Sequence, residues 1–183
     1  NGLANGNYGV GAGSGTNVSP TSVDTALSGV RIFEAYPSFA KIDLSSSDKL
    51  LVSGDNKTLY KYSVTANGGD IAIYKFSFAV SSSSKPGSTG ATTSKFGLYA
   101  YTDSTFSTID TAFSSDGLLN YGTCFNGFSS TAANKVNGSA NPLEIYMDKG
   151  TTCNNATTTY TVPKTQTRWF KLTATVASTE VLS

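Results

Sequence analysis

Two alternating runs separated by a short polar break constrain the fold of this chain more than any other feature. They form the segment LYKYSVTANGGDIAIYKFSFAVS, residues 59–81. In each run an apolar or aromatic residue recurs at every second position, which is the period of a half-buried β-strand. The segment therefore predicts two strands that each turn one face towards a core.

The aromatic residues of these strands are the predicted centre of that core. Tyr60, Tyr62 and Val64 share one side of the first run, and Ala72, Tyr74, Phe76, Phe78 and Val80 share one side of the second. Aromatic side chains bury large areas, which favours a core over the alternative of an exposed sugar-binding platform. The predicted core aromatics are Tyr60, Tyr62, Tyr74, Phe76, Phe78 and, from a later strand, Phe170.

The polar break NGGD, residues 67–70, allows two kinds of connection. A glycine-rich break between alternating runs is typical of a tight hairpin. In a two-sheet protein the same break can carry the chain from one sheet to the other. We expect the crossing between sheets.

Further strands are predicted over 30–37, 95–103, 141–150, 157–163 and 167–178. Pro37 marks either the end of the first of these or an edge position. Residues 104–113 fit a helical turn or a strand with a loop, since Phe106, Ile109 and Phe113 recur at spacings of three and four. Short alternating strands with polar turns predict an all-β fold, an antiparallel Ig-like β-sandwich of about seven strands.

The charge of the chain is sparse. Charged residues make up 14% and the net charge is +1, with no cluster of Lys or Arg. Nucleic acid is therefore not an expected partner, because phosphate binding needs clustered positive charge. No run of about 18 apolar residues occurs, so no transmembrane segment is predicted. The hydroxyl-rich composition and a start at Asn1 rather than Met suggest export by a signal peptide to the extracellular space or cell surface.

Residues 1–28 form a Gly-, Asn- and Ser-rich segment, called the arm below, that precedes a β-sandwich domain at 29–183. The arm has few apolar residues and cannot pack a core alone. It is either a flexible leader or a strand donor that becomes ordered on a neighbouring copy. In the second case its anchoring residues are Leu3, Tyr8 and Val10.

Cys124 and Cys153 are the two cysteines of the chain. In an exported protein they predict a disulfide, and closing a loop of this length stabilises by roughly 3–4 kcal/mol on the chain-entropy model. Two free thiols are the alternative. Four N-x-S/T sequons mark possible glycosylation sites at Asn17, Asn56, Asn137 and Asn155.

Catalytic chemistry has little support in the sequence. The chain has no His, which excludes a Ser–His nucleophile and the usual zinc sites. Glu34 and Glu144 are the candidates for a carboxylate pair, although solvent-facing strand positions explain both. Asp residues in turns suit calcium only weakly, because turns favour Asp for backbone reasons. We therefore expect no enzyme activity, no metal and no cofactor.

The segment VRIFEAYPSF followed by LYKYSVTANGGDIAIYKFSFAVS resembles Ig-like β-sandwich modules in large exported surface proteins of uncultivated bacterial lineages. The resemblance covers roughly residues 30–80 and extends loosely to WFKLTATV. It implies an extracellular structural role and supplies no catalytic residues.

Taken with the arm, these features predict an extracellular structural protein, a subunit of a cell-surface filament or layer. Copies would associate into a homo-polymer by strand addition, through the arm or the C-terminal end at 177–183. The alternative is a monomeric adhesin or carbohydrate-binding module that takes a glycan or cell-surface ligand. Its candidate ligand-facing residues are Tyr99, Tyr101, Tyr121 and Trp169.

Overall fold

The computed structural model describes residues 9–10, 17–18, 34–50, 52–81, 92–121, 125–126, 137–149 and 158–177. The chain divides into two units, Asn1–Ile32 and Phe33–Ser183. In the first unit β1 (Gly9–Val10) pairs antiparallel with β2 (Asn17–Val18). The remaining described elements belong to the second unit.

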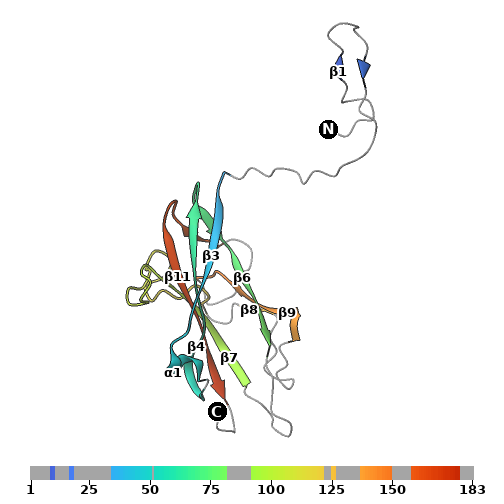
Figure 1. Ribbon diagram of the computed structural model, residues 1–183. Coiled ribbons are helices and arrows are strands. Elements are labelled where there is room, and N and C mark those ends of the chain that lie inside the picture. The colour runs from blue at the N-terminus through green and yellow to red at the C-terminus, as the bar shows by residue number, and fades with distance from the viewer. Residues whose placement is uncertain are drawn as a thin grey trace. The chain divides into compact units, whose positions relative to one another are not determined.

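The second unit contains two main antiparallel sheets, and the predicted all-β class is confirmed. The four-stranded sheet runs in the order β3 (Tyr36–Ile42), β4 (Gly54–Asn67), β11 (Thr167–Ala177) and β7 (Thr92–Tyr101) (Figure 1). The three-stranded sheet has the order β6 (Lys75–Ser81), β9 (Asn137–Tyr146) and β8 (Phe125–Asn126).

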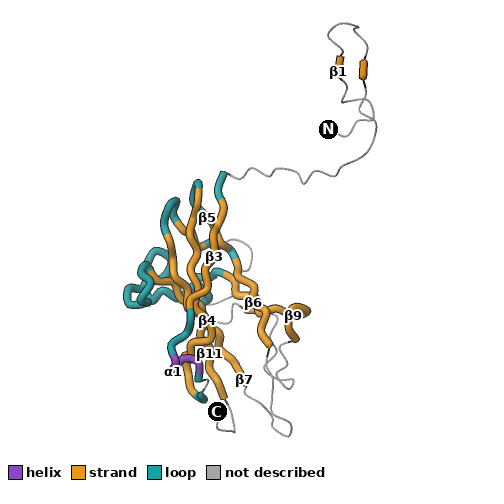
Figure 2. The backbone as a smooth tube through the Cα atoms, viewed as in Figure 1, coloured by secondary structure: helices purple, strands orange, loops and turns teal. Residues whose placement is uncertain are grey.

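Two smaller elements complete the described structure. A short pair joins β5 (Ile71–Ile73) to β10 (Tyr160–Val162). Figure 2 shows α1 (Ser46–Lys49), the one helix in the described ranges, before β4. Ser45 caps it by accepting a hydrogen bond from the Asp48 N–H at 3.1 Å.

The polar break at 67–70 carries the chain between sheets, as predicted. β4 lies in the four-stranded sheet, whereas β5 pairs only with β10 among the described strands. Gly68 turns the chain with a φ of +83°, and a Cβ there would lie 2.1 Å from the Glu34 carbonyl oxygen. Both conditions require glycine.

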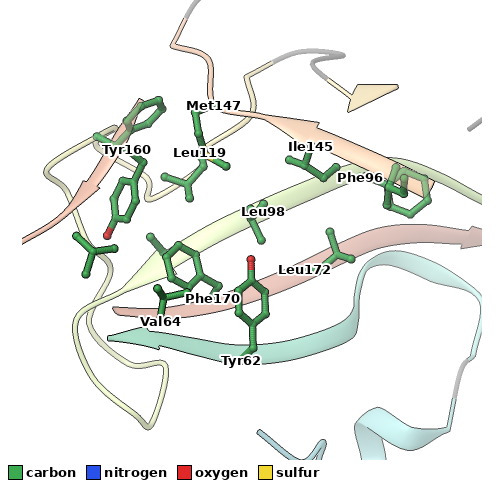
Figure 3. Close-up of a cluster of buried hydrophobic side chains, with 14 of the residues drawn as sticks. Tyr62, Val64, Phe96, Leu98, Leu119, Ile145, Met147, Tyr160, Phe170 and Leu172 are labelled. Atoms are coloured by element: carbon green, nitrogen blue, oxygen red, sulfur yellow. The ribbon is translucent and has the colours of Figure 1, made fainter. Parts of the chain in front are cut away.

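The core lies between the two main sheets. Val64, Leu98 and Phe170 of the four-stranded sheet are fully buried, as is Ile145 of β9 (Figure 3). Leu143 of β9 is fully buried too. The apolar residues predicted to face the core in β7, β9 and β11 are buried, and Tyr101 and Thr173 on the other face are buried as well. The alternating core-facing set from these strands and the residue after β9 is Phe96, Leu98, Ala100, Leu143, Ile145, Met147, Phe170, Leu172, Ala174 and Val176.

The predicted core aromatics divide into three groups. Tyr62 and Phe170 are buried, which confirms them, and their rings stack with centroids 5.1 Å apart. Phe76 and Phe78 are partly buried and pack against the core. Tyr60 and Tyr74 were wrongly predicted, since they are 36% and 51% exposed.

The two errors have separate physical causes. Tyr74 lies between β5 and β6, where the alternation changes phase, so that Ile71 and Ile73 pack against the core before the break and Phe76 after it. Ala72, predicted on the core side, is exposed for the same reason. Tyr60 shares a side with Tyr62 but lies where the facing sheet leaves a groove.

Strand boundaries also differ near the start of the domain. Of the strand predicted at 30–37, residues 30–33 lie outside the described ranges, 34–35 form a bend, and 36–37 begin β3, which runs over Tyr36–Ile42. Pro37 therefore lies within an edge strand. Proline is tolerated there because a residue whose N position faces solvent needs no hydrogen bond to a neighbouring strand. Residues 104–113 contain turns and a single bridge from Ile109 to Tyr101, not a helix.

Candidate functional site

One side of the sandwich-like unit is closed by a crossing segment, residues 117–121. The Leu119 N–H donates to the Leu98 carbonyl of β7 at 2.8 Å, and the Asp148 N–H after β9 donates to the Leu119 carbonyl at 2.8 Å. The buried Asn120 amide pairs with the backbone of Leu98 and Phe96. This closing segment therefore satisfies the edge of β7 and connects the two sheets.

The opposite side has no such segment in the part of the chain that the structure describes. There β3 pairs only with β4, and β6 pairs only with β9. Each strand presents its outer edge without a strand partner among the described residues. Unpaired edges of this kind are templates for another strand.

A cavity of about 620 Å³ lies between these strands and is called the edge groove below. Its lining is mostly apolar, with five aromatic rings and one charged residue. The lining residues are Phe39, Ala40, Lys41, Leu59, Tyr60, Tyr62, Phe76, Ser77, Phe78, Ala79 and Leu172. Large exposed apolar surfaces of this kind mark interaction sites.

Phe39 shows why the groove is open. It lies opposite the buried Val64 in the register of β3 and β4, and therefore on the core side of the sheet. Its side chain is nevertheless 62% exposed. The three-stranded sheet does not extend over it, so a core-facing position of β3 is left in contact with solvent.

The aromatic lining is continuous with the core. Tyr62 meets Phe76 edge-on at 5.2 Å, and Phe78 meets Tyr60 edge-on at 6.3 Å. Such pairs contribute about 0.5–1.5 kcal/mol each beyond their buried area. The groove is thus a fixed feature of the packed unit.

Tyr62 also carries an unsatisfied polar atom. Its hydroxyl is buried and has no hydrogen-bond partner among the described residues. Burial raises the pKa of Tyr62 well above its usual value, so the hydroxyl keeps its proton and is a donor. A buried donor left without an acceptor costs about 1–3 kcal/mol.

The predicted ligand-facing aromatics do not form an open platform. Trp169 lies opposite Tyr101, and Lys171 opposite Tyr99, on the outer face of the four-stranded sheet. Tyr101 is only 7% exposed, which contradicts its predicted role. Tyr121 lies apart from the other three, in the closing segment, where its N–H donates to the Asp148 carbonyl.

The cause is a loop that folds over Tyr101. Phe106 meets the Tyr101 ring edge-on at 5.3 Å, and the Lys171 ammonium lies 4.8 Å from the centre of that ring. Asp103 holds the loop, because its carboxylate accepts bonds from Thr105 and from backbone N–H groups of the loop. The Thr105 side chain, followed by these N–H groups, holds the pKa of Asp103 far below its usual range.

The other turn aspartates also accept hydrogen bonds from the protein. Asp55 accepts from the Thr175 hydroxyl, Asp70 from the Lys164 N–H, and Asp116 from the Leu118 N–H. The described residues contain no group of three potential metal ligands. Each of the three carboxylates thus has a donor within the protein, from its own turn for Asp116 and from a distant segment for Asp55 and Asp70.

Glu144 lies in an ion pair on the outer face of β9. Its carboxylate accepts from the Lys75 ammonium and from the Tyr146 hydroxyl, the latter at 2.6 Å. These two bonds, in that order, lower the pKa of Glu144. A glycosidase needs one carboxylic acid with a raised pKa, and Glu144 has the opposite shift.

A buried polar network was missed from the sequence. Asp110 is 4% exposed, and one of its oxygens accepts from Arg168 Nε at 2.6 Å and from the Tyr160 hydroxyl at 2.7 Å. Its other oxygen accepts from the Ala112 N–H at 2.9 Å. The network ties the segment after β7 to β10 and β11, which is a structural role.

The predicted glycosylation sites, arm residues and cysteines lie partly inside and partly outside the described residues. Asn17 and Asn137 lie in β2 and β9, and Asn56 lies in β4 with a φ of +53°. Val10 lies in β1. Of the predicted site residues, the structure does not describe Leu3, Tyr8, Cys124, Cys153 and Asn155. The disulfide between the two cysteines therefore stays a prediction.

Comparison of the chain with protein-family models, curated proteins and solved structures found no match. No helix in the described ranges has the length and apolar composition needed to cross a membrane.

Proposed function

We propose that the protein is an extracellular structural subunit of a surface filament or layer, in which one copy adds a strand to the edge groove of the next. The observation that carries the proposal is the edge groove itself, an aromatic cavity between two strands with unpartnered outer edges. An added strand would supply backbone hydrogen bonds to these edges and side chains to the aromatic lining.

The closed side of the same unit supports this argument. There the closing segment bonds both to β7 and to Asp148, two residues after β9, which satisfies one edge and connects the sheets. A strand in the edge groove would likewise bond the outer edges of β3 and β6 and connect the two sheets. The fold thus contains, on one side, the kind of contact that the proposal requires on the other.

The geometry of such a contact favours extended assemblies. The groove and the donated segment are different surfaces, so each copy can donate to one neighbour and accept from another. Heterologous contacts of this type propagate into open filaments unless the rotation closes a ring. The sparse charge and the resemblance to Ig-like modules of exported surface proteins support an extracellular location.

A matched pair of arginine substitutions tests the groove by electron microscopy. Ala79 is exposed and lines the groove, whereas Ala72 is exposed on β5 and outside it. We expect filaments or sheets from the unaltered protein and from Ala72→Arg, and single particles from Ala79→Arg. Bulk and charge in the groove would exclude the added strand.

The unfolding midpoints of both variants, measured by circular dichroism, show that each is folded. Single particles from all three proteins would overturn the proposal, and glycan binding by those particles would favour the adhesin alternative. Filaments from Ala79→Arg would also overturn it, since assembly would then not use the groove.

A further inference from the structure

We infer that the strand filling the edge groove is the uncharged part of the arm of a second copy, residues 1–23, and that one of its backbone carbonyls accepts the Tyr62 hydroxyl. This inference rests on the proposed function. It adds which segment is donated and which buried atom of the acceptor recognises it.

The strands beside the groove favour an extended peptide as its occupant. The two strands beside it, β3 and β6, have seven residues each, and both offer outer edges without strand partners in the described ranges. A small apolar ligand could cover the aromatic rings but would leave these backbone groups unpaired. An extended peptide satisfies the rings and the backbone together.

The segments on either side of the described strands supply two candidate donors, and charge distinguishes them. The stretch after β11 contains Glu180. The arm has no charged residue before Asp24. A seven-residue strand spans about 23 Å at 3.3 Å per residue, so the arm can supply both a strand and a linker.

The charge of the groove fits an uncharged donor. Lys41 is its one charged lining residue, and its ammonium lies 3.5 Å from the Asp43 carboxylate. Its side chain is largely exposed, so solvent and Asp43 already compensate the charge. Burying an unpaired carboxylate against the aromatic lining would be unfavourable.

The side-chain pattern of the arm also suits the groove. Tyr8 and Val10 are two positions apart, so in a strand they share a face and can enter the groove together. Gly and Ala alternate with larger residues nearby, which allows close approach to the edges. Gly9–Val10 and Asn17–Val18 already pair as strands, so this sequence adopts the extended backbone that donation needs.

The Tyr62 hydroxyl gives the acceptor a recognition element. It lies on a residue that lines the groove, and it is a buried donor without an acceptor in the described structure. Every residue of an entering strand brings a backbone carbonyl. An added strand that packs against the Tyr62 ring would bring one of these carbonyls within reach of the hydroxyl.

The test measures binding of a fluorescein-labelled peptide of residues 1–23 to a chain lacking residues 1–28. The hydrophobic core consists of residues between Tyr62 and Ala174, so the deletion removes none of it. We expect saturable binding by fluorescence anisotropy, weakened at least about tenfold by Ala79→Arg in the acceptor. A Val10→Asp peptide serves as the matched control and should bind much more weakly.

Tyr62→Phe in the acceptor separates recognition from folding. It removes a buried hydroxyl that has no partner, so the unfolding midpoint should stay the same or rise. Peptide affinity should fall about threefold to tenfold, which a purely structural role would not produce. Equal affinity would overturn the role assigned to the hydroxyl.

The remaining outcomes separate this inference from the proposed function. Failure of the peptide to bind, alongside groove-dependent filaments of the full chain, would overturn the arm as donor and keep the proposed function. Peptide binding alongside a monomeric full chain would mean that the arm fills the groove of the same chain. This result would overturn the claim that a second copy donates the arm. Absence of both binding and filaments would overturn the inference and the proposed function together.

Discussion

Replacing Phe170 by alanine is expected to lower the free energy of unfolding by about 3–5 kcal/mol, a large part of the stability of a domain of this size. Phe170 is fully buried in β11. Its ring stacks on Tyr62 at 5.1 Å and meets Phe76 and Tyr160 edge-on at 5.2 and 5.7 Å. The substitution would leave a cavity that rings from three different strands cannot fill by local adjustment.

Urea unfolding followed by tyrosine and tryptophan fluorescence measures this loss, with Phe39→Ala as the matched control. The same truncation at the exposed Phe39 should change the free energy of unfolding of the monomer by less than about 1 kcal/mol. Since Phe39 lines the groove, it should instead weaken assembly. Equal destabilisation by the two substitutions would contradict the assignment of core and groove.

Replacing Asp110 by alanine is expected to cost a similar amount, about 3–5 kcal/mol, for an electrostatic reason. The Arg168 side chain is 15% exposed and its ion pair with Asp110 is short, at 2.6 Å. Without the carboxylate, the guanidinium and the Tyr160 hydroxyl would both lose their buried acceptor. Urea unfolding at neutral pH measures the loss.

Asp43→Ala is the control, because its pair with Lys41 is exposed on both sides and should contribute little. Equal losses from the two substitutions would contradict the burial argument.

The pH dependence provides a second check on Asp110. Burial alone would raise the pKa of this carboxyl, but the Ala112 N–H, Tyr160 and Arg168 outweigh burial and lower the pKa below its usual 3.8. A lowered folded-state pKa stabilises the protein above the unfolded-state pKa, and this contribution is lost as the pH falls through the folded-state value. The difference between the unaltered protein and Asp110→Ala should therefore narrow below about pH 3.8. A difference that stays constant there would contradict the ionised network.

The sequence predicted most of the fold because a half-buried strand requires apolar residues at alternate positions, and this pattern is visible in the sequence. Phe96, Leu98 and Ala100 in β7 and the alternating residues of β11 are buried as expected. The crossing at 67–70 was also correctly predicted. The exposure of Tyr74 was not predicted. The core-facing positions shift by one residue between β5 and β6, and this shift depends on the strand with which each of them pairs.

The candidate site could be predicted only in part, because it arises from pairings far apart in the sequence. Tyr62, Phe76 and Phe78 were correctly placed in or against the core, but their second role in lining the groove depends on where the facing sheet ends. Phe106, with a left-handed φ of +59°, covers Tyr101 in a way that no periodicity signals. Asp110 meets Arg168 only after β7 and β11 have paired, so no local motif marks their network.

Hydrogen exchange of assembled and monomeric protein, read by mass spectrometry, tests strand addition at the open side most directly. We expect the amides of β3 and β6 to exchange at least about tenfold more slowly in the assembly, because an added strand would bond their outer edges. Peptides from β7, whose edge the closing segment already covers, should show no change. Unchanged exchange in β3 and β6, or new protection confined to other strands, would contradict strand addition at the edge groove.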